Sequence, residues 1–538
     1  MPLYLGLDSS TQGLTAIVIS IEEGERRVAF ESSLSFDDIL PHYGTTHGVL
    51  PRADPTAATS SPLMWAEALD VMMARIAGSG LDLQQIAAIS GSAQQHGSVY
   101  LNAAWIHTVG TLDANRPVVE QFPRVFARQE SPIWMDSSTA EECAEITASV
   151  GGADVLASRT GSRAFERFTG PQIRRFFKRS PEGFRQTRRV HLVSSFLASI
   201  LAGTDAPIDP GDGSGMNLMD LAIHDWWPVA VDATAPGLRD KLPPIAPSRT
   251  VVGTLSRYFQ VRYGFPAAKV IAWSGDNPCS LIGTGLVREG RVAVSLGTSD
   301  TVFGLMQQPR VDVTGTGHVF GSPTGDYMGL TCFQNGSLAR ERVRNEFGMD
   351  WAGFSRALET TAPGGHIVLP WFEPEITPAV PIAGVRRYGT GDRSPDTEVR
   401  ALVDAQMMSM ALHSNWMGVH IDTIHATGGA AANRSILQTM ADVFGATVYQ
   451  LAVGQSAALG AALRAAHGDL ATSDSPADWE EVVHGFAEPI ASTRLPPDSR
   501  RHEFYRELMR VYAACEAHAL GRGPNPAPLL RALPGCAV

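Results

Sequence analysis

Arg291-Val-Ala-Val-Ser-Leu-Gly-Thr-Ser-Asp-Thr-Val-Phe303 is the stretch of sequence that decides the fold. Small and apolar residues lie on both sides of the Gly297–Ser299 segment, which predicts two strands joined by a tight turn. Glycine lets the backbone turn closely and leaves its amides unshielded. Thr298, Ser299 and Asp300 add two hydroxyls and a carboxylate. A hairpin tip with free N–H groups and hydroxyls is typical of a phosphate cradle.

The beginning of the chain repeats this pattern. Leu3-Tyr-Leu-Gly-Leu-Asp-Ser-Ser-Thr-Gln-Gly-Leu-Thr-Ala-Ile-Val-Ile19 reads as a strand, an acidic and hydroxyl-rich turn, and a second strand. One hairpin of this kind says little about phosphate. Two of them, one opening each half of a long chain, predict a duplicated α/β fold with a nucleotide between the halves.

Size and composition narrow the possible functions. At 538 residues the chain exceeds what one core usually supports, so we expect two or more domains. A net charge of -12 argues against a nucleic-acid or anionic-membrane partner, and no apolar run is long enough to span a membrane. We find no signal peptide, and the 5 cysteines are scattered, so we expect a cytoplasmic protein with free thiols.

Several enzyme classes are excluded by missing motifs. No Gly-Lys-Ser/Thr occurs, so a Walker-type phosphate loop is ruled out. A serine hydrolase would need Gly-x-Ser-x-Gly, and a dinucleotide enzyme would need Gly-x-Gly-x-x-Gly after a strand; neither is present.

A third informative segment lies near the end of the chain. Residues 423–449 predict a strand, a Gly-Gly-Ala turn, a helix and a strand. The turn lacks side-chain bulk, so a flat ring or a phosphate can lie against its backbone. The helix expected at Ser456–Ala466 is rich in small residues and is suited to close packing.

Polar side chains follow two short buried strands in the first half. The strand at Gln85–Gly91 runs into Ser-Ala-Gln-Gln-His-Gly-Ser, and in open α/β sheets this is where ligands bind. His96 is therefore either a ligand contact or a loop histidine that caps a backbone group. Asp276 and Asn277 follow the strand at Val270–Trp273 and begin a helix, so they can cap it, serve chemistry, or do both.

Two further segments are rich in candidate groups. Arg163 and Arg167 lie four residues apart, so one helical face could carry both. We expect Arg163 to pair with Glu166 at the surface and Arg167 to reach a cleft. Residues 208–217 are a turn-rich segment that is either a loop over a site or a connector.

These parts together suit phosphoryl transfer from ATP, which needs a metal held by a carboxylate, donors on the phosphates and a base for the acceptor hydroxyl. Asp8 suits the metal, because Mg²⁺ keeps most of its waters and takes few carboxylates. Asp276 suits the base, and an ordinary aspartate pKa of about 4 would keep it ionised at neutral pH.

In these residues the chain resembles the FGGY carbohydrate kinases of the actin/hexokinase/heat-shock ATPase fold, and within them those of the eukaryotic xylulose kinase type. The resemblance covers nearly the whole chain. Its motifs are Asp8-Ser-Ser-Thr-Gln12, Ser90-Gly-Ser-Ala-Gln-Gln-His-Gly-Ser98, Trp134-Met-Asp-Ser-Ser-Thr139, Thr160-Gly-Ser-Arg-Ala-Phe-Glu-Arg-Phe-Thr-Gly170, Asp212-Gly-Ser-Gly-Met-Asn-Leu218, Gly275-Asp-Asn-Pro278, Val294-Ser-Leu-Gly-Thr-Ser-Asp-Thr301 and Ala426-Thr-Gly-Gly-Ala430. Ser10 departs from the pattern, because many members have glycine there.

The resemblance implies two actin-like (ribonuclease H-like) domains with the active site in the cleft between them. Residues 1–286 would bind the sugar, and residues 287–538 would bind ATP. It also implies transfer of the ATP γ-phosphoryl group, with Mg²⁺, to the 5-hydroxyl of D-xylulose. Carried over to this chain, the substrate-binding residues are His96, Arg167, Asp276 and Asn277, with Asp276 as the general base. The ATP-binding residues are Thr11, Gln12, Gly297, Thr298, Ser299, Trp351, Gly429, Ala430 and Asn433, and Asp8 is the metal ligand.

Two alternatives stay open from sequence. One is a kinase of another sugar or polyol, such as ribulose, glycerol or gluconate, with the same phosphate machinery. The other is a non-sugar actin-like ATPase, which would have no need for the Gln-Gln-His-Gly segment or the Asp-Asn pair. We expect small-molecule substrates and a monomer or homodimer.

Overall fold

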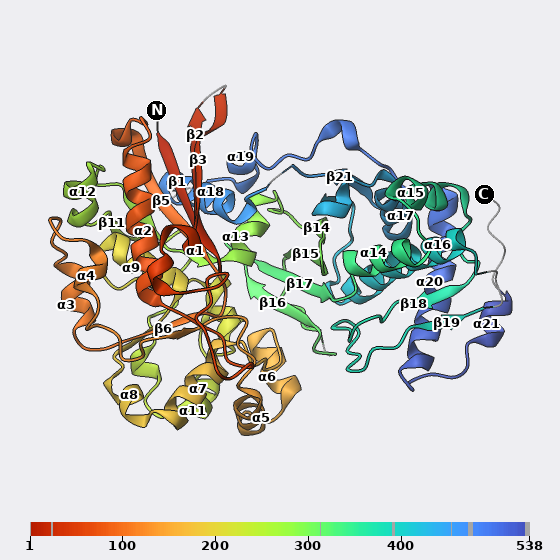
Figure 1. The fold of residues 1–538 in the computed structure, drawn as a ribbon, viewed down its shortest axis with the longest axis horizontal. Coiled ribbons are helices and arrows are strands. Elements are labelled where there is room, and N and C mark those ends of the chain that lie inside the picture. The colour runs from red at the N-terminus through yellow and green to blue at the C-terminus, as the bar shows by residue number, and fades with distance from the viewer. Residues whose placement is uncertain are drawn as a thin grey trace.

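The computed structural model describes residues 2–22, 25–312, 314–389, 393–452, 454–471 and 477–532. The chain forms two lobes, each built on a mixed sheet (Figure 1). In the first lobe the strand order is β11-β12-β5-β1-β2-β3, and β13 pairs with β5. These strands are β1 (Leu3–Ser9), β2 (Gly13–Glu22), β3 (Glu25–Ser35), β5 (Ile86–Ala93), β11 (Val251–Thr254), β12 (Lys269–Ile271) and β13 (Ser274–Gly275).

The second sheet has the order β16-β17-β15-β14-β20-β21. Its strands are β14 (Arg291–Leu296), β15 (Asp300–Met306), β16 (Gly317–Gly321), β17 (Tyr327–Phe333), β20 (Thr423–Thr427) and β21 (Thr447–Gln450). In both sheets an antiparallel hairpin opens the domain, a third strand extends it, and parallel strands add on the other side of the first strand. The predicted duplication and the two predicted hairpins are therefore confirmed.

Helices pack against both sheets through their buried apolar residues. In the first lobe α2 (Pro62–Ala77) and α9 (Val193–Ala202) pack into the core that surrounds β1 and β5. In the second lobe α16 (Pro395–Ser414), α17 (Arg434–Phe444) and α20 (Ser499–Ala519) form the corresponding core.

Helix α18 (Ser456–Leu470) crosses back from the second half of the sequence and packs against β1, β5 and α13 (Asp276–Gly283). A Cβ on Gly460 would lie 1.9 Å from the Cys279 carbonyl oxygen, and one on Gly283 would lie 1.9 Å from the Ser456 oxygen. Only glycine permits this approach of two helix backbones. The small-residue composition of the helix is explained by this packing.

Other expectations need revision. Residues 161–168 contain no helix, because α7 begins at Thr169, and Arg163 forms its ion pair with Asp154 rather than Glu166. Residues 208–217, predicted as a turn-rich loop over a site or a connector, form a largely buried segment that contains α10 (Pro210–Gly213) and a short 3-10 turn. In the part of the chain that the structure describes, no helix has the length and apolar character needed to span a membrane.

Candidate active site

The first hairpin tip, between β1 and β2, is a tight turn whose ends are joined by hydrogen bonds. Ser9 pairs with Leu14, and the Ser10 amide donates to the Gly13 carbonyl over 3.0 Å. The Ser10 hydroxyl donates to the same oxygen over 3.2 Å. Because its amide is already used, Ser10 does not offer that group to a ligand. Thr11 lies within the turn, and its hydroxyl accepts a 2.8 Å hydrogen bond from the Trp134 indole.

The second hairpin tip is the Gly297–Ser299 segment between Leu296 and Asp300. Thr298 is exposed at the tip. Gly297 does not adopt a positive φ, so its role is steric: a Cβ there would lie 3.2 Å from the Ser299 carbonyl oxygen. Thr298 is exposed and Gly297 and Ser299 are partly exposed, while phosphate binding at this tip stays a prediction.

The Asp300 carboxylate does not face the tip, contrary to our expectation. It turns into the core, where it accepts two 2.9 Å hydrogen bonds from the Arg340 guanidinium. Arg340 also donates to Gln406 and Ser337, and the Ser337 amide donates to the Gly297 carbonyl over 2.9 Å. This buried ion pair holds the tip against the start of α14 (Ser337–Glu346).

In the first lobe two carboxylates flank the end of β5. Asp8 lies opposite Ser92 on the neighbouring strand, and Asp276 follows β13, which pairs with the last residues of β5. Within the described part of the chain, Asp8 Oδ1 is buried without a hydrogen-bond partner, as are both amide atoms of Gln94. Buried polar atoms are normally satisfied, so this unpaired group indicates a place for a ligand.

The electrostatics of Asp276 differ from our expectation of an ordinary carboxyl. Burial, together with the nearby Asp8 carboxylate, raises the pKa of Asp276 to about 7. The Asp276 carboxyl also accepts a 2.8 Å hydrogen bond from the Asn277 amide. A carboxyl that titrates near neutral pH is well matched to proton transfer.

The Gln-Gln-His segment lies beside this helix start. Asn277 Nδ2 donates a 2.8 Å hydrogen bond to Gln95 Oε1. His96 is buried with a φ of 70°, and its Nδ1 donates to the Gly215 carbonyl over 2.8 Å. Burial and the charge of Arg167 hold the pKa of His96 well below its usual value. His96 therefore does cap a backbone group, and as a neutral imidazole it keeps Nε2 as an acceptor.

Arg167 completes this side of the site. Its guanidinium lies over the rings of Phe165 and Phe168, 5.1 and 5.7 Å from their centroids, and the Phe168 ring contacts His96 at 4.5 Å. Arg167 Nη2 donates to His318 Nε2 over 3.3 Å. Sequence reasoning missed His318, because it lies on β16 of the other lobe and nothing in its local pattern marks it.

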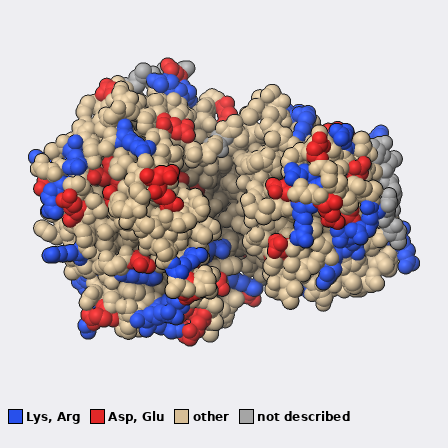
Figure 2. All heavy atoms as spheres, in the orientation of Figure 1, with Lys and Arg blue, Asp and Glu red and all other residues tan. Residues whose placement is uncertain are grey.

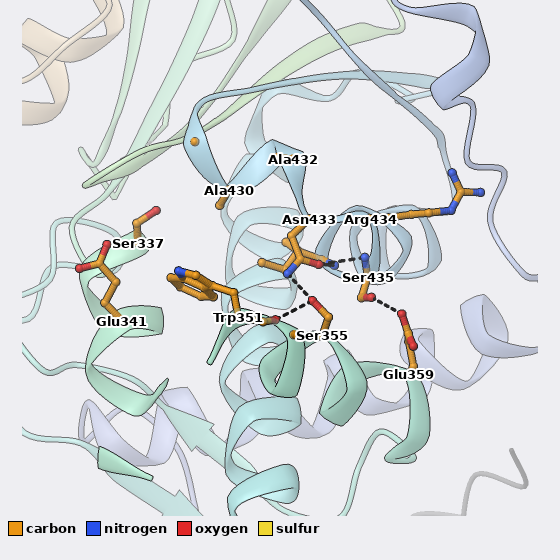
Figure 3. A pocket seen from close by; sticks show the side chains of 13 residues that line it. Ser337, Glu341, Trp351, Ser355, Glu359, Ala430, Ala432, Asn433, Arg434 and Ser435 are labelled. Carbon is orange, nitrogen blue, oxygen red and sulfur yellow. Dashed lines mark hydrogen bonds between the residues drawn. The ribbon is translucent and has the colours of Figure 1, made fainter. Parts of the chain in front are cut away.

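A pocket of about 700 Å³ lies in the second lobe, beside the Gly-Gly-Ala turn (Figure 3). Four of the predicted residues line it: Trp351, Gly429, Ala430 and Asn433. In the figure the Trp351 ring lies between Glu341 and Asn433, below Ala430.

Two features shape the back of this pocket. Asn433 Oδ1 caps α17 by accepting from the Ser435 amide, while Nδ2 donates to the Ser355 hydroxyl over 2.9 Å. Gly428 has a φ of 85°, and a Cβ there would lie 2.5 Å from the Leu296 oxygen, so the turn sits directly on the end of β14. This contact joins the pocket to the strand that leads to the second tip.

Among the described residues no group of three or more His, Cys, Asp or Glu side chains could hold a metal ion. Mg²⁺, however, commonly uses only one or two carboxylates plus substrate phosphates. The unpaired Asp8 oxygen beside Asp276 fits that requirement.

The predicted residues thus gather in two groups. His96, Arg167, Asp276, Asn277 and Asp8 lie in the first lobe. The residues predicted to bind ATP lie in the second lobe, except for Thr11 and Gln12, which lie at the first hairpin tip. The space-filling view shows a hollow between the larger lobe and the smaller one (Figure 2). The arrangement is that of a two-lobed phosphotransferase.

Comparisons with known proteins agree with this class. Residues 129–283 match the N-terminal domain of the FGGY family of carbohydrate kinases, and residues 292–468 match its C-terminal domain. The chain is 42% identical to the xylulose kinase of Mus musculus, covering 97% of this chain and 95% of the mouse one. It is 41% identical to xylulose kinase 2 of Arabidopsis thaliana, covering 87% of both chains.

Solved structures show the same fold. The xylulose kinase of Rhodospirillum rubrum superposes with a TM-score of 0.80 at 20% identity, covering 96% of this chain and 99% of that one. The Plasmodium falciparum glycerol kinase with ADP superposes with a TM-score of 0.75 at 16% identity, covering 96% of this chain and 98% of that one. The chain belongs to the FGGY family of carbohydrate kinases. It is an ATP-dependent carbohydrate kinase.

Proposed function

We propose that the chain transfers the γ-phosphoryl group of ATP to the 5-hydroxyl of D-xylulose, giving D-xylulose 5-phosphate and ADP. The relatives at 41–42% identity bear the name xylulose kinase. The observation that carries the proposal is the grouping of Asp276, Asn277, His96 and Arg167 beside the end of β5. This group has carboxylate, amide, imidazole and guanidinium functions, which suit a polyhydroxylated acceptor.

Asp276 would act as the general base. Ionised, it accepts the proton of the 5-hydroxyl as that oxygen attacks the γ-phosphorus, and such a base typically contributes about 10²–10⁴-fold to the rate. Asn277 holds the start of α13 against Gln95, which fixes the direction of the carboxylate. His96 Nε2 would accept a hydrogen bond from a sugar hydroxyl, and Arg167 would donate one.

Asp8 would hold Mg²⁺, directly or through water. The ion, when bound, would neutralise charge on the β- and γ-phosphates. The Oδ1 atom of Asp8 is buried without a hydrogen-bond partner in the protein, and this supports the assignment of Asp8 as the metal ligand. A cation at Asp8 would also offset the charge that disfavours ionisation of Asp276.

ATP would lie in the second lobe. The pocket beside the Gly-Gly-Ala turn is large enough for adenosine, and Trp351, Gly429, Ala430 and Asn433 are among the residues that line it. The phosphates would extend past Gly297, Thr298 and Ser299, toward Thr11 and Gln12 of the first tip. The start of α14 lies beside the second tip, and a helix N-terminus favours negative charge.

A panel of acceptors tests the proposal. ADP release is measured with D-xylulose, D-ribulose, glycerol, gluconate and no sugar. We expect D-xylulose to give the highest kcat/KM. A higher value for another acceptor would reassign the substrate, and equal turnover without sugar would favour the actin-like ATPase instead.

The remaining assignments follow from the same arrangement. We propose a division near residue 286, with the sugar lobe before it and the nucleotide lobe after it, except that α18 packs on the first sheet. We also propose a cytoplasmic location and a monomer or homodimer. The free thiols of Cys143, Cys279, Cys332 and Cys515 suit a reducing compartment.

A further inference from the structure

Strand β16 of the second lobe reaches across to the first lobe. The Val319 amide donates to the Gly161 carbonyl over 3.0 Å, and the Gly321 amide donates to the Ser214 hydroxyl over 2.9 Å. Gly161 and Ser214 belong to the two segments that carry Arg167 and Gly215. The second lobe therefore contacts the sugar side of the site as well as forming the nucleotide side.

His318 directly precedes Val319, which makes the first of these crossing contacts. It is 4% exposed, and its ring lies 4.9 Å from Phe165, 5.8 Å from Phe168 and 6.0 Å from Phe320. The surrounding rings shield the imidazole from solvent, so its two hydrogen bonds to the protein determine which ring nitrogen carries the proton.

Those two hydrogen bonds define the tautomer. Arg167 Nη2 lies 3.3 Å from His318 Nε2, and a guanidinium can only donate, so Nε2 must accept. The proton is therefore on Nδ1, which lies 3.0 Å from the Ser162 hydroxyl. Burial and the charge of Arg167 lower the pKa of His318 to about 3, in agreement with a neutral ring.

Arg167 depends on this ring for its direction. Among the described residues no carboxylate forms an ion pair with its guanidinium. Its polar contact is His318, and its faces lie over the rings of Phe165 and Phe168. A partly exposed guanidinium held by a neutral acceptor keeps its charge and its remaining N–H groups for a ligand.

We propose that His318 is a positioning residue of the sugar site: it accepts a hydrogen bond from Arg167 across the lobe interface and holds the guanidinium toward the acceptor sugar. The role in sugar binding rests on the proposed function. It follows that the sugar site is complete only when β16 of the second lobe lies against the first lobe. Sugar affinity is thereby coupled to lobe position.

Three substitutions at one position separate positioning from packing. His318→Phe keeps a ring but has no acceptor. His318→Gln places an oxygen near the position of Nε2, whereas His318→Asn places one near Nδ1. His502→Gln, in a partly buried histidine on α20 that bonds the Asp442 carbonyl, is the matched control.

We expect His318→Phe and His318→Asn to raise the KM for D-xylulose about tenfold, since hydrogen bonds to charged groups contribute on this scale. The KM for ATP stays within about twofold of wild type, as do both KM values of His502→Gln. His318→Gln recovers most of the affinity for sugar. Equal KM values for sugar in the Gln and Asn variants, or a wild-type value in the Phe variant, would overturn the proposal. If the Phe variant does not fold, the Gln and Asn pair decides.

A second measurement is independent of the sugar assignment. ¹⁵N-histidine NMR, with His318→Gln to identify the signal, reports the tautomer directly. We expect an Nδ1–H ring that does not titrate between pH 5 and 8 and whose Nε2 signal shifts in Arg167→Lys. An Nε2–H ring would contradict the proposal even if the enzyme phosphorylates D-xylulose. If wild type phosphorylates no sugar, the proposed function fails while the Arg167–His318 link is still decided by NMR.

Discussion

Asn277 Nδ2 lies 2.8 Å from Gln95 Oε1, and this hydrogen bond joins the start of α13 to the Gln-Gln-His segment. The two segments are more than 180 residues apart in sequence, yet they act as one unit because β5 and β13 are neighbours in the sheet. The proposed base and the proposed sugar contacts are therefore held together by this hydrogen bond.

The raised pKa of Asp276 predicts an acid limb in the pH profile. The pKa is about 7, so the carboxyl becomes protonated as the pH falls below 7 and can no longer accept a proton. We expect kcat/KM to fall about tenfold per pH unit below that value, when measured at limiting Mg²⁺. Raising the Mg²⁺ concentration should move the limb to lower pH, because a cation near Asp8 stabilises the ionised form. A flat profile from pH 5 to 8 at every Mg²⁺ concentration would remove Asp276 as the titrating base.

His96 should act on the sugar rather than on ATP. His96→Ala removes the imidazole that is packed against Phe168, and we expect the KM for sugar to rise by about tenfold or more. The KM for ATP should change by much less, because the pocket proposed to bind the nucleotide is lined by residues of the other lobe. Initial rates over a grid of both substrates separate the two constants. An equal rise in both would place His96 elsewhere.

Substitution of Trp351 should raise the KM for ATP rather than the KM for sugar. Its ring is 42% exposed along the pocket wall and is held by Arg344, whose guanidinium lies 4.4 Å from the ring centroid. Stacking of a base on an aromatic ring contributes about 1–3 kcal/mol, so Trp351→Ala should raise the KM for ATP about five- to 150-fold. Trp227→Ala is the control, because Trp227 is a partly exposed tryptophan of the first lobe and belongs to neither proposed binding site. An unchanged KM for ATP in Trp351→Ala would show that the base does not bind there.

The buried ion pair between Asp300 and Arg340 should contribute strongly to the stability of the fold. Both side chains are buried, so Arg340→Ala leaves an unpaired carboxylate and should cost about 3–5 kcal/mol of the free energy of unfolding. Urea denaturation measures this loss. The exposed pair between Arg510 and Glu507 is the control, and its removal should cost less than about 1 kcal/mol. A small loss for Arg340→Ala would show that the tip does not depend on this pair.

The sequence predicts the parts of this protein that depend on local pattern. Both hairpins and the Gly-Gly-Ala turn were predicted correctly, because period-2 alternation and glycine turns are local signals. The repetition of the first hairpin in the second predicted the duplicated topology.

The predictions that were wrong concern features that depend on contacts between distant parts of the chain. Arg163 and Arg167 share a helical spacing, yet Gly161 and Ser162 are bonded to β16 and the segment does not become a helix. The position of Asp300 next to the turn suggests a side chain that faces the tip, but in the structure its carboxylate forms a buried ion pair with Arg340. The pKa of Asp276 depends on burial and on Asp8, and the spacing of residues does not report either.

The most direct test of the central claim compares wild type with Asp276→Asn, using D-xylulose and ATP. Product is followed by ADP release, the phosphorylated position is identified by phosphorus–proton NMR, and ATP affinity is measured by calorimetry. We expect wild type to place phosphate on the 5-hydroxyl, and the variant to lose about 10²–10⁴-fold in kcat while binding ATP normally. Turnover by Asp276→Asn close to that of wild type would contradict the account.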